Sequence, residues 1–306
     1  MYSPQPHQVK TISAYHALMG LPKPAHPLIS VVNFEDIKHL PGDASISLAI
    51  DFYSIALKRN CNVKMKYGQQ PYDFDEGLMT FIAPGQVYRI EVDNAEELTH
   101  SGWLLLIQPD FLWNTPLAKT IRHYDYFGYS VKEALLLSDK EETTISGLLR
   151  GIEQEYHANL DAFCERIIIA QLEVLLAYAE RFYHRQFLTR KITNHQLLQQ
   201  LEAVLADYFT GDTVAQHGLP SVQYVADALH VSPNYLSGLL KVLTGQSTQQ
   251  HIHDKLLEKA KEKLSTTTLT VSEIAYALGF EHPQSLSKLF KTKTNLSPRQ
   301  FRQSFN

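Results

Sequence analysis

The chain is poor in cysteine: Cys61 and Cys164 are its only two, and they lie far apart in the sequence. We interpret both as reduced thiols of a cytoplasmic protein, the alternatives being a disulfide or a redox sensor. No apolar run approaches the ~18–20 residues that span a bilayer, which predicts no membrane segment. Residues 1–7 lack a basic stretch followed by an apolar core, so we also expect no signal peptide.

Positive charge is scarce as well, because the 306 residues carry a formal net charge of −4. The charge is unevenly distributed along the chain. Residues 219–306 contain ten Lys or Arg and six Asp or Glu, a net charge of +4, whereas residues 1–218 have a net charge of −8. DNA affinity depends on local neutralisation of phosphates, so the modest C-terminal surplus is compatible with DNA binding.

The length of the chain favours two or three domains, and short strand-like segments fill residues 46–108. Alternating or short apolar runs cover residues 46–55, 62–67, 78–82, 87–92 and 102–107. Pro84-Gly85 is typical of a turn in which glycine takes a positive φ. The pattern favours a β-sandwich or small β-barrel. Residues 1–45 are rich in Pro and His with little periodicity and predict an arm or irregular cover.

Helical spacing begins after residues 108–110, with helices predicted over about 140–158 and 161–186. The second helix contains an apolar stripe, which packs on the strand region in one interpretation and meets a second subunit in the other. The candidate dimer contacts on this stripe are Ile168, Leu172, Leu175 and Phe182. Ile167, Val174 and Tyr178 broaden it, so both interpretations can hold on different faces.

The rest of the chain is predicted to be helical. One helix covers about 195–209, and residues 210–220 form the clearest linker. Further helices are expected at about 221–229, 233–243, 247–264, 271–278, 283–293 and 297–304. The helix over 247–264 has an apolar face and is the natural rigid connector between the segments on either side of it.

These C-terminal residues carry one short pattern twice. Val225-Ala226, Leu229 and the run from Leu236 to Lys241 recur as Ile274-Ala275, Leu278 and the run from Leu286 to Lys291. The offset is 49 residues before the turn and 50 after it, which indicates two similar small folds in tandem. The spacing is that of a helix-turn-helix, whose second helix lies in the major groove of DNA.

Local residue choices fit this motif. The small Ala226 and Ala275 let the two helices of each copy touch, and Ser232-Pro233 is typical of an N-cap and first helical position. Each turn needs a residue that tolerates positive φ. Gly279 suits that position in the second copy. His230 occupies it in the first copy, and histidine adopts a positive φ less readily than glycine.

The outward side chains of the two recognition helices are the candidate DNA contacts. Asn and Gln suit adenine and Lys suits guanine, but Gly238 offers no side chain. The predicted contacts are Asn234, Ser237, Gly238, Lys241, Pro283, Gln284, Ser285, Ser287, Lys288 and Lys291. Lys241 and Lys291 are expected at phosphates, with Lys293, Arg299 and Arg302 as further phosphate candidates. The alternative for any single residue is a solvated helix face.

The run from Thr270 to Phe280, Phe290-Lys291 and the run from Ser297 to Arg302 resemble the signature of the AraC family of transcription regulators. Residues 232–237 resemble the first helix-turn-helix of that family, and the resemblance covers about residues 195–306. Gly238, Leu286 and Asn295 depart from the family's frequent polar, aromatic and glycine residues. The Gly238 departure implies a weaker first recognition helix that depends on DNA shape and phosphates.

The resemblance implies an α+β fold: an N-terminal cupin-like β-barrel with two helices, followed by an all-α double helix-turn-helix domain. The expected divisions are a sensor and dimerisation domain over 1–190, a connecting helix and linker over 191–220, and a DNA-binding domain over 221–306. The implied partners are double-stranded DNA, a small-molecule effector, a second copy of the chain and RNA polymerase. The resemblance favours activation over repression.

Many cupins are metal enzymes, whose site needs His-x-His on one strand with a carboxylate and a later His. Residues 46–108 contain only His100, and the single His-x-His, His251-Ile252-His253, lies in a predicted helix where the two rings point to opposite sides. No nucleophile elbow, phosphate loop or Cys-x-x-Cys appears. We therefore predict no enzymatic activity, no metal and no cofactor, with His100 and His123 as surface or core residues.

The strand region supplies candidate effector contacts, the alternative being an ordinary outer face. These candidates are Asp51, Tyr53, Lys64, Tyr67, Tyr88 and Arg89. The rival hypothesis for the whole chain is a ligand-binding cupin protein whose helical region mediates protein contacts. It predicts no salt-dependent affinity for DNA.

Overall fold

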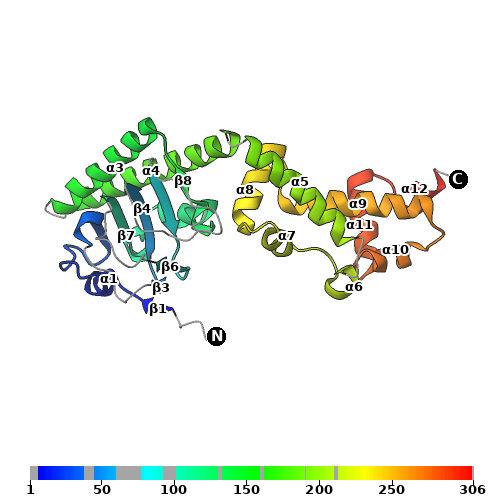
Figure 1. Cartoon of the computed structure of the whole chain (residues 1–306), viewed down its shortest axis with the longest axis horizontal. Helices are drawn as coiled ribbons and strands as arrows, with labels where there is room; N and C mark the ends of the chain where they lie inside the picture. Colours follow the sequence, from blue (N-terminus) through cyan, green and yellow to red (C-terminus); the bar gives the residue numbers. More distant parts are fainter. Residues whose placement is uncertain are drawn as a thin grey trace. The chain divides into compact units, whose positions relative to one another are not determined.

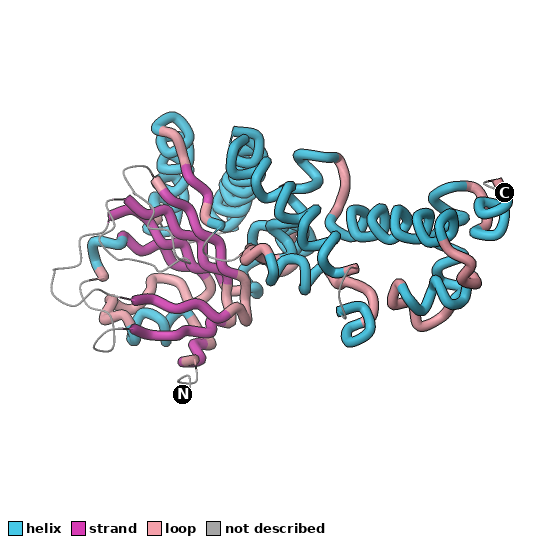
Figure 2. Tube along the Cα trace, turned by 45° about the vertical axis from the view of Figure 1, so that its right-hand side comes forward, coloured by secondary structure: helices cyan, strands magenta, loops and turns pink. Residues whose placement is uncertain are grey.

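The computed structural model describes residues 6–37, 45–59, 77–91, 101–129, 133–158, 162–189, 191–209 and 213–304. The chain divides into two compact units, Met1–Gln186 and Phe187–Asn306. Over the described ranges, all strands belong to the first unit, and the second is helical (Figure 2). No helix in these ranges is long and apolar enough to span a membrane.

Two sheets form the first unit. The three-stranded sheet has the order β1 (His7–Val9), β3 (Ser45–Ile50), β6 (Val87–Glu91), with β1 and β3 parallel. The five-stranded sheet is antiparallel, in the order β2 (Ile29–Asn33), β7 (Ser101–Ile107), β4 (Tyr53–Arg59), β5 (Leu78–Ile82), β8 (Leu135–Leu136). As far as the structure describes the strands, they form these two sheets and not one closed barrel.

The two sheets share one apolar core. Leu48 and Tyr88 of the three-stranded sheet belong to the same buried cluster as Ala56, Leu104 and Leu106 of the five-stranded sheet. Burial of this apolar surface is what holds the sheets together, and each leucine contributes about 1.5–3 kcal/mol when fully buried. The alternating sequence pattern places these residues inward because successive strand side chains point to opposite faces.

Most strand predictions are confirmed, and two features differ. The strands expected at 78–82, 87–92 and 102–107 are β5, β6 and β7, and Gly85 has a φ of 81°. Residues 46–55 form two strands, because a bend at Asp51–Phe52 sends the chain from one sheet to the other. The strand expected at 62–67 lies outside the described residues.

Residues 6–37 contain more regular secondary structure than their composition suggests. β2 pairs along its whole length with β7, and α1 (Ile12–Leu18) places Ile12 and Tyr15 in the core between the sheets. His16 is buried and its ring nitrogens lie 2.6 Å from the Pro22 carbonyl oxygen and 2.9 Å from Ser30 Oγ. The prediction of an arm or irregular cover is therefore corrected for this segment, whose strand is stabilised by long-range pairing with β7.

Short helices lie between strands of the first unit. η1 (Phe34–Asp36) follows β2, and four more lie between β7 and β8: η2 (Pro109–Leu112), α2 (Leu117–Thr120), η3 (Ile121–His123) and η4 (Asp125–Gly128). The long helices α3 (Asp139–His157) and α4 (Ala162–Thr189) confirm the two predicted at about 140–158 and 161–186. They lie side by side along the five-stranded sheet (Figure 1). The Tyr126 hydroxyl donates to the Leu176 carbonyl, which ties η4 to α4 at 2.9 Å.

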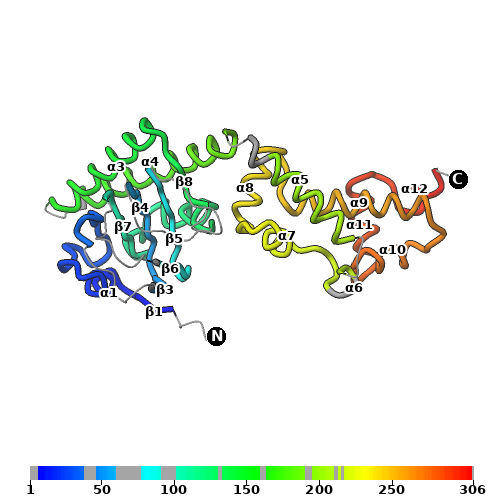
Figure 3. Tube along the Cα trace, viewed as in Figure 1, coloured from blue at the N-terminus to red at the C-terminus, as the bar shows by residue number. Residues whose placement is uncertain are grey.

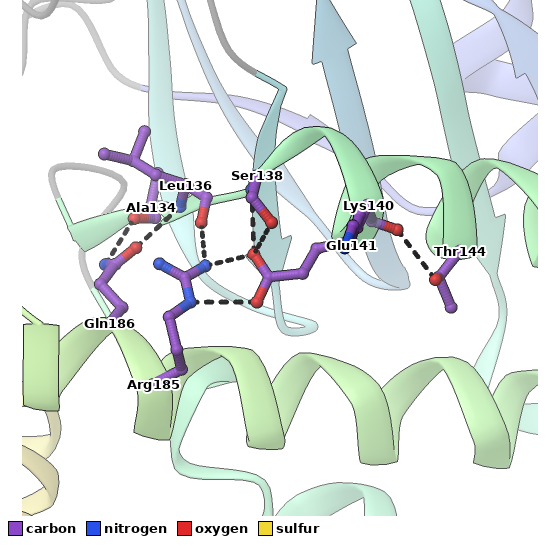
Figure 4. Close-up of polar contacts among 8 residues, drawn as sticks. All are labelled: Ala134, Leu136, Ser138, Lys140, Glu141, Thr144, Arg185 and Gln186. Atoms are coloured by element: carbon purple, nitrogen blue, oxygen red, sulfur yellow. Dashed lines mark hydrogen bonds and ion pairs between the residues drawn. The ribbon is translucent and has the colours of Figure 1, made fainter.

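A polar cluster fixes the C-terminal part of α4 to the start of α3 and to β8 (Figure 4). The Arg185 guanidinium donates to both carboxylate oxygens of Glu141, at 3.0 and 2.6 Å, and to the Leu136 carbonyl at 2.7 Å. Gln186 accepts from the Leu136 N–H at 2.8 Å. Glu141 also completes a capping box with Ser138, so one carboxylate serves the α3 N-terminus and α4 together.

The apolar stripe of α4 is buried within its own unit. Ile168, Leu172 and Leu175 have no exposed surface, and Phe182 is 6% exposed. These four side chains face the interior and are not available to a second subunit as the structure stands, which corrects their assignment as dimer contacts. The opposite side of α4 exposes Phe163, Ile167 and Val174.

The second unit contains eight helices over its described residues (Figure 3). They are α5 (Lys191–Tyr208), α6 (Thr213–His217), α7 (Val222–Ala228), α8 (Pro233–Thr244), α9 (Thr248–Thr266), α10 (Val271–Ala277), α11 (Pro283–Thr294) and α12 (Pro298–Gln303). All seven helices predicted after residue 195 are present. One buried cluster joins α5, through Leu201 and Leu205, to both helix-turn-helices, so α5 is part of this unit's core.

Candidate nucleic-acid interface

Two helix pairs, α7–α8 and α10–α11, have the same turn geometry. The Val231 N–H donates to the Ala226 carbonyl, and the Phe280 N–H donates to the Ala275 carbonyl, both at 3.0 Å. Ala226 and Ala275 are fully buried where the helices touch. The expected positive φ is confirmed in both turns, at 57° for His230 and 85° for Gly279.

Gly279 is also required by a close backbone approach. A Cβ added there would lie 2.5 Å from the Gly218 carbonyl carbon and 2.9 Å from the Leu219 nitrogen. The Tyr208 hydroxyl donates to the Gly218 carbonyl at 3.0 Å and holds this segment in place. The turn of the second helix-turn-helix therefore packs directly on the backbone that leads into α7.

The recognition helix α8 begins as predicted, with Ser232 as N-cap accepting from the Tyr235 N–H at 3.2 Å and Pro233 in the first turn. Its apolar face is buried, with Leu236 and Leu240 fully covered. Asn234 and Lys241 are exposed, and Gly238 is half-buried between them.

Ser237 is half-buried on the face of α8 that also carries Asn234 and Lys241, three and four residues away. Its hydroxyl lies 2.9 Å from the hydroxyl of Thr248, a residue with no exposed surface at the start of α9. This hydrogen bond gives Ser237 a structural partner within the protein. Ser237 therefore joins α8 to α9, and its contact with DNA stays a prediction.

The recognition helix α11 exposes a longer polar face. Gln284, Ser285, Lys288 and Lys291 are exposed at positions i, i+1, i+4 and i+7, which lie on one side of a helix. Pro283 and Ser287 are half-buried beside them. Leu286 and Phe290 are fully buried on the other side.

Sequence reasoning overlooked one residue at the start of α11. His282 is the N-cap of this helix, is exposed, and makes no side-chain cap hydrogen bond, unlike Ser232 at the matching position of α8. Its imidazole therefore does not cap the helix, and it lies two residues before Gln284. Alignment of the two X-Pro pairs, Ser232-Pro233 and His282-Pro283, was the signal that could have found it.

The two recognition helices end in matching caps. Gly245 and Asn295 both adopt the left-handed conformation, with φ of 75° and 59°, and donate to the carbonyls of Lys241 and Lys291 at 3.1 and 2.9 Å. The expectation that Asn295 tolerates this conformation is confirmed. Lys241 and Lys291 therefore occupy equivalent exposed positions one turn before the helix ends.

Two of the three further phosphate candidates have protein partners. Lys293 forms an ion pair with Asp254, at 2.9 Å. Arg302 donates to the carbonyls of Leu264 and Leu269, at 3.1 and 2.6 Å, so its guanidinium closes the end of α9. Arg299 is exposed at the start of α12 and stays a candidate.

The four described candidates for effector contacts lie in different surroundings. Tyr88 is buried between the sheets, whereas its neighbour Arg89 is exposed on the other face of β6. Tyr53 is buried against Phe127, with 5.2 Å between ring centroids, and Asp51 is half-buried at the bend. Lys64 and Tyr67 lie outside the described residues.

Tyr88 has a tyrosine neighbour in the core that the sequence did not single out. Burial raises the pKa of Tyr15 to about 12, partly offset by a hydrogen bond with Tyr88. Burial also raises the pKa of Tyr88 well above its ordinary value. Both phenols are therefore neutral over the physiological range and act as hydrogen-bonding groups.

His251 and His253 have separate partners, as their spacing on α9 predicts. His251 Nε2 lies 2.9 Å from Thr244 Oγ1, and His253 Nε2 lies 3.0 Å from Gln249 Nε2. Partial burial lowers the pKa of each imidazole, against the opposing effect of Asp254. His123 is exposed, and His100 is not among the described residues.

Comparison with known proteins identifies the C-terminal motif and the whole chain. A family model described as a helix-turn-helix domain matches residues 225–304. The transcriptional activator RhaS of Salmonella paratyphi B is 32% identical over 256 residues, covering 83% of this chain and 86% of that protein. The chain belongs to the AraC family of transcription regulators. It is thus a DNA-binding regulator of transcription, and the helix-turn-helix match includes both α8 and α11.

Matches confined to the C-terminal region accompany this whole-chain similarity. The uncharacterised regulator YobQ of Bacillus subtilis is 34% identical over 82 residues, which is 27% of this chain and 34% of that protein. The C-terminal domain of the response regulator yesN from Fusobacterium nucleatum is 28% identical and covers 34% of this chain and 95% of that chain, with a TM-score of 0.30.

Proposed function

We propose that this AraC-family protein is a cytoplasmic, sequence-specific activator of transcription that presents α8 and α11 to successive segments of the major groove. The single observation that supports this most is the face of α11, where four polar side chains are exposed opposite two fully buried apolar ones. A recognition helix needs this division, because one face packs on its supporting helix and the other contacts bases. The RhaS similarity supports activation, which requires a contact with RNA polymerase.

We assign base contacts mainly to α11. Gln284 suits adenine and Lys288 suits guanine, whereas Lys291, at the end of the helix, suits a phosphate. On α8, Asn234 is the base-contact candidate and Lys241 the phosphate candidate. Arg299 adds a further phosphate contact at α12.

Substitution tests this division of roles. Gln284→Ala and Lys288→Ala should each cost about 1–3 kcal/mol on the preferred site and relax the sequence preference at one position. Lys291→Ala should weaken binding to all DNA similarly and reduce the salt slope by about 1. Identical behaviour of all three variants would show that the base contacts are wrongly assigned.

Footprinting tests the function itself. The full chain should protect a site in the DNA upstream of its own gene or elsewhere in the genome, and the absence of any protected site would refute the proposal. A titration at two salt concentrations separates the rival hypothesis. A ligand-binding protein whose helical region contacts only proteins would show no salt-dependent DNA affinity.

For the first unit we propose a cupin-like sensor that has no enzymatic role and binds a small effector or pairs subunits. Its support is the arrangement of two sheets around one apolar core, followed by two long helices. Among the described candidates for effector contacts, Tyr88 is the one that faces that core, together with Tyr15. An effector that enters between the sheets would meet these two phenols.

We propose that dimerisation uses the exposed side of α4. Its exposed small and apolar residues between 163 and 177 are Phe163, Ile167, Ala170, Val174 and Ala177. They follow spacings of four, three, four and three residues, which is the seam of a two-helix coiled coil. A second copy of the chain is the occupant that this self-complementary pattern favours, because a symmetric dimer places the same face on both sides.

A charge placed in this seam should separate the subunits. Ile167→Glu would bury an unpaired carboxylate, at a cost of several kcal/mol, so the dimer dissociation constant should rise at least about 100-fold. Sedimentation of the full chain measures this. Arg150→Glu, an exposed charge change on α3, is the control and should leave the oligomeric state unchanged. Equal behaviour of the two variants would refute the proposed interface.

A further inference from the structure

One carboxylate in the second unit joins the ends of the two recognition helices. Asp254 lies on α9, the long helix between them. Its Oδ2 accepts from Gln246 Nε2 at 3.0 Å, and Gln246 directly follows the C-cap of α8. Its Oδ1 accepts from Lys293 Nζ at 2.9 Å, and Lys293 lies in the last turn of α11. Each oxygen thus serves a different helix-turn-helix.

Two other ion pairs on α9 do not contact either helix-turn-helix, because both partners lie on α9 itself. Lys255 pairs with Glu258, and Lys259 pairs with Glu262, both at 2.9 Å and both three residues apart on the same helix. These pairs support α9 itself and cannot orient one helix-turn-helix relative to the other. They are a natural internal comparison for Asp254.

Lys293 points away from the face of α11 that we assign to DNA. Nine residues separate it from Gln284, which at about 100° per residue places the two on opposite sides of the helix. When Gln284 and Lys288 lie in the major groove, Lys293 therefore faces α9. Its contact with Asp254 is compatible with DNA binding and does not have to break.

The pair contributes orientation more than stability. The Lys293 and Asp254 side chains are 31% and 41% exposed, and exposed ion pairs are worth about 0–1 kcal/mol. The shared apolar cluster, with Leu240, Leu256 and Phe290, supplies most of the stability of this unit. Apolar contacts are non-directional, whereas hydrogen bonds to two separate oxygens constrain angle and distance.

We propose that Asp254 is a positioning residue that sets the relative placement of α8 and α11, and so the spacing that the protein prefers between its two half-elements on DNA. The inference rests on the proposed function, because it presupposes that both helices bind one DNA molecule. DNA rotates by a full turn in about 10–10.5 base pairs, so one base pair changes both the distance and the angle between two bound helices.

The experiment measures spacing preference with the full chain. A site selected from random DNA by the unaltered protein is prepared with one base pair removed or inserted between its two half-elements. Dissociation constants are measured on the three duplexes for the unaltered protein, Asp254→Ala, and the control Glu262→Gln, which removes a pair of equal length within α9. The exchange Asp254→Lys with Lys293→Asp tests rescue.

We expect Asp254→Ala to reduce the preference for the selected spacing about threefold or more, which corresponds to about 0.7 kcal/mol and lies in the range of an exposed pair. The charge exchange should recover part of that preference, and Glu262→Gln should leave it unaltered. The salt slope should not change, because Lys293 is not at a phosphate.

Three results would overturn the inference. One is an unchanged spacing preference in Asp254→Ala. Another is an equal loss of affinity on all three duplexes together with a lower unfolding temperature, which would make the role one of stability alone. The third is a salt slope steeper by about 1, which would place the released Lys293 at a phosphate. Failure of the unaltered protein to select any sequence would instead refute the proposed function.

Discussion

The first helix-turn-helix exposes Asn234 and Lys241 on α8 with the bare Gly238 between them, whereas the second exposes four polar side chains on α11. Their inward faces are nearly alike. Leu236 and Leu240 are fully buried in one copy, and Leu286 and Phe290 in the other. The buried faces of α8 and α11 therefore pack in the same way. Their outward faces differ in how many side chains they offer to bases.

The turns add a second difference. Both need a positive φ, but only the second has glycine there, and only that glycine abuts other backbone, at Gly218. The second copy is thus fixed both to its own partner helix and to the segment that enters α7. It combines the more constrained turn with the richer recognition face, and we infer that it carries most of the sequence preference.

The largest effect is expected from Gly279→Ala. The added Cβ would meet backbone atoms at 2.5 and 2.9 Å, and the left-handed conformation costs an L-residue about 1–2 kcal/mol. Together with the forced shift of neighbours, unfolding free energy should fall by about 3 kcal/mol or more. Denaturant unfolding of the full chain measures it.

Gly245→Ala is the matched control, since its φ is 75° and a Cβ there would meet nothing within 4 Å. Only the conformational cost of about 1–2 kcal/mol should appear. An equal loss in both variants would show that the approach to Gly218 is unimportant, and would remove one of the two differences between the turns.

The next effect concerns the bare position on α8. Gly238→Arg should give the first recognition helix a base contact worth about 1–3 kcal/mol on DNA with guanine in reach. Binding selection should then show a new base preference under α8. Gly238→Ala controls for the gain in helix propensity, about 1 kcal/mol, which changes stability without adding a base contact. If the arginine variant selects the same sequences as the alanine variant, α8 is not limited by its missing side chain.

A smaller effect separates structural from DNA-contacting serines. Ser237→Ala removes the partner of the buried Thr248 hydroxyl, so it should cost about 1 kcal/mol of unfolding free energy and leave base preference unchanged. Ser285→Ala on the exposed face of α11 should do the reverse. A changed base preference in Ser237→Ala would instead show that this residue also contacts DNA.

The helices could be predicted from the sequence because their signals are local. Ser232-Pro233 and Gly245 mark the two ends of α8 directly, and the repeat then locates α11 by comparison. The partner that each side chain finds within the protein was harder to predict. Ser237 and Lys293 have partners on α9, and Arg302 has carbonyl partners more than 30 residues away in the chain. Helical spacing alone does not identify such partners.

In the first unit, too, features with local sequence signals could be predicted and features that depend on long-range contacts could not. β5, β6 and β7 follow from alternation, but β2 is held by β7, about 70 residues later in the chain, which composition cannot reveal. On α4, the helical spacing of apolar residues predicted the buried stripe. It did not show which of two apolar faces packs inside the unit. That depends on how the helix is rotated when it packs. The contacts that fix this rotation are long-range: Tyr126 donates to Leu176 of α4, and Arg185 of α4 pairs with Glu141 of α3.

The smallest predicted effect concerns the turn of the first copy. His230 has a φ of 57°, where an L-residue pays a cost that glycine avoids. Against this, glycine makes the unfolded chain more flexible, so His230→Gly should stabilise the protein by only about 0.5–1 kcal/mol. Asn295→Gly, at a φ of 59°, is the comparison and should gain less, because Asn adopts this conformation more readily. Thermal unfolding of both variants distinguishes them. If His230→Gly raises stability and leaves DNA affinity unchanged, the His230 side chain is strained and is not needed for binding. If DNA binding becomes weaker, the exposed imidazole belongs to the interface, and the two helix-turn-helices differ less than their sequences suggest.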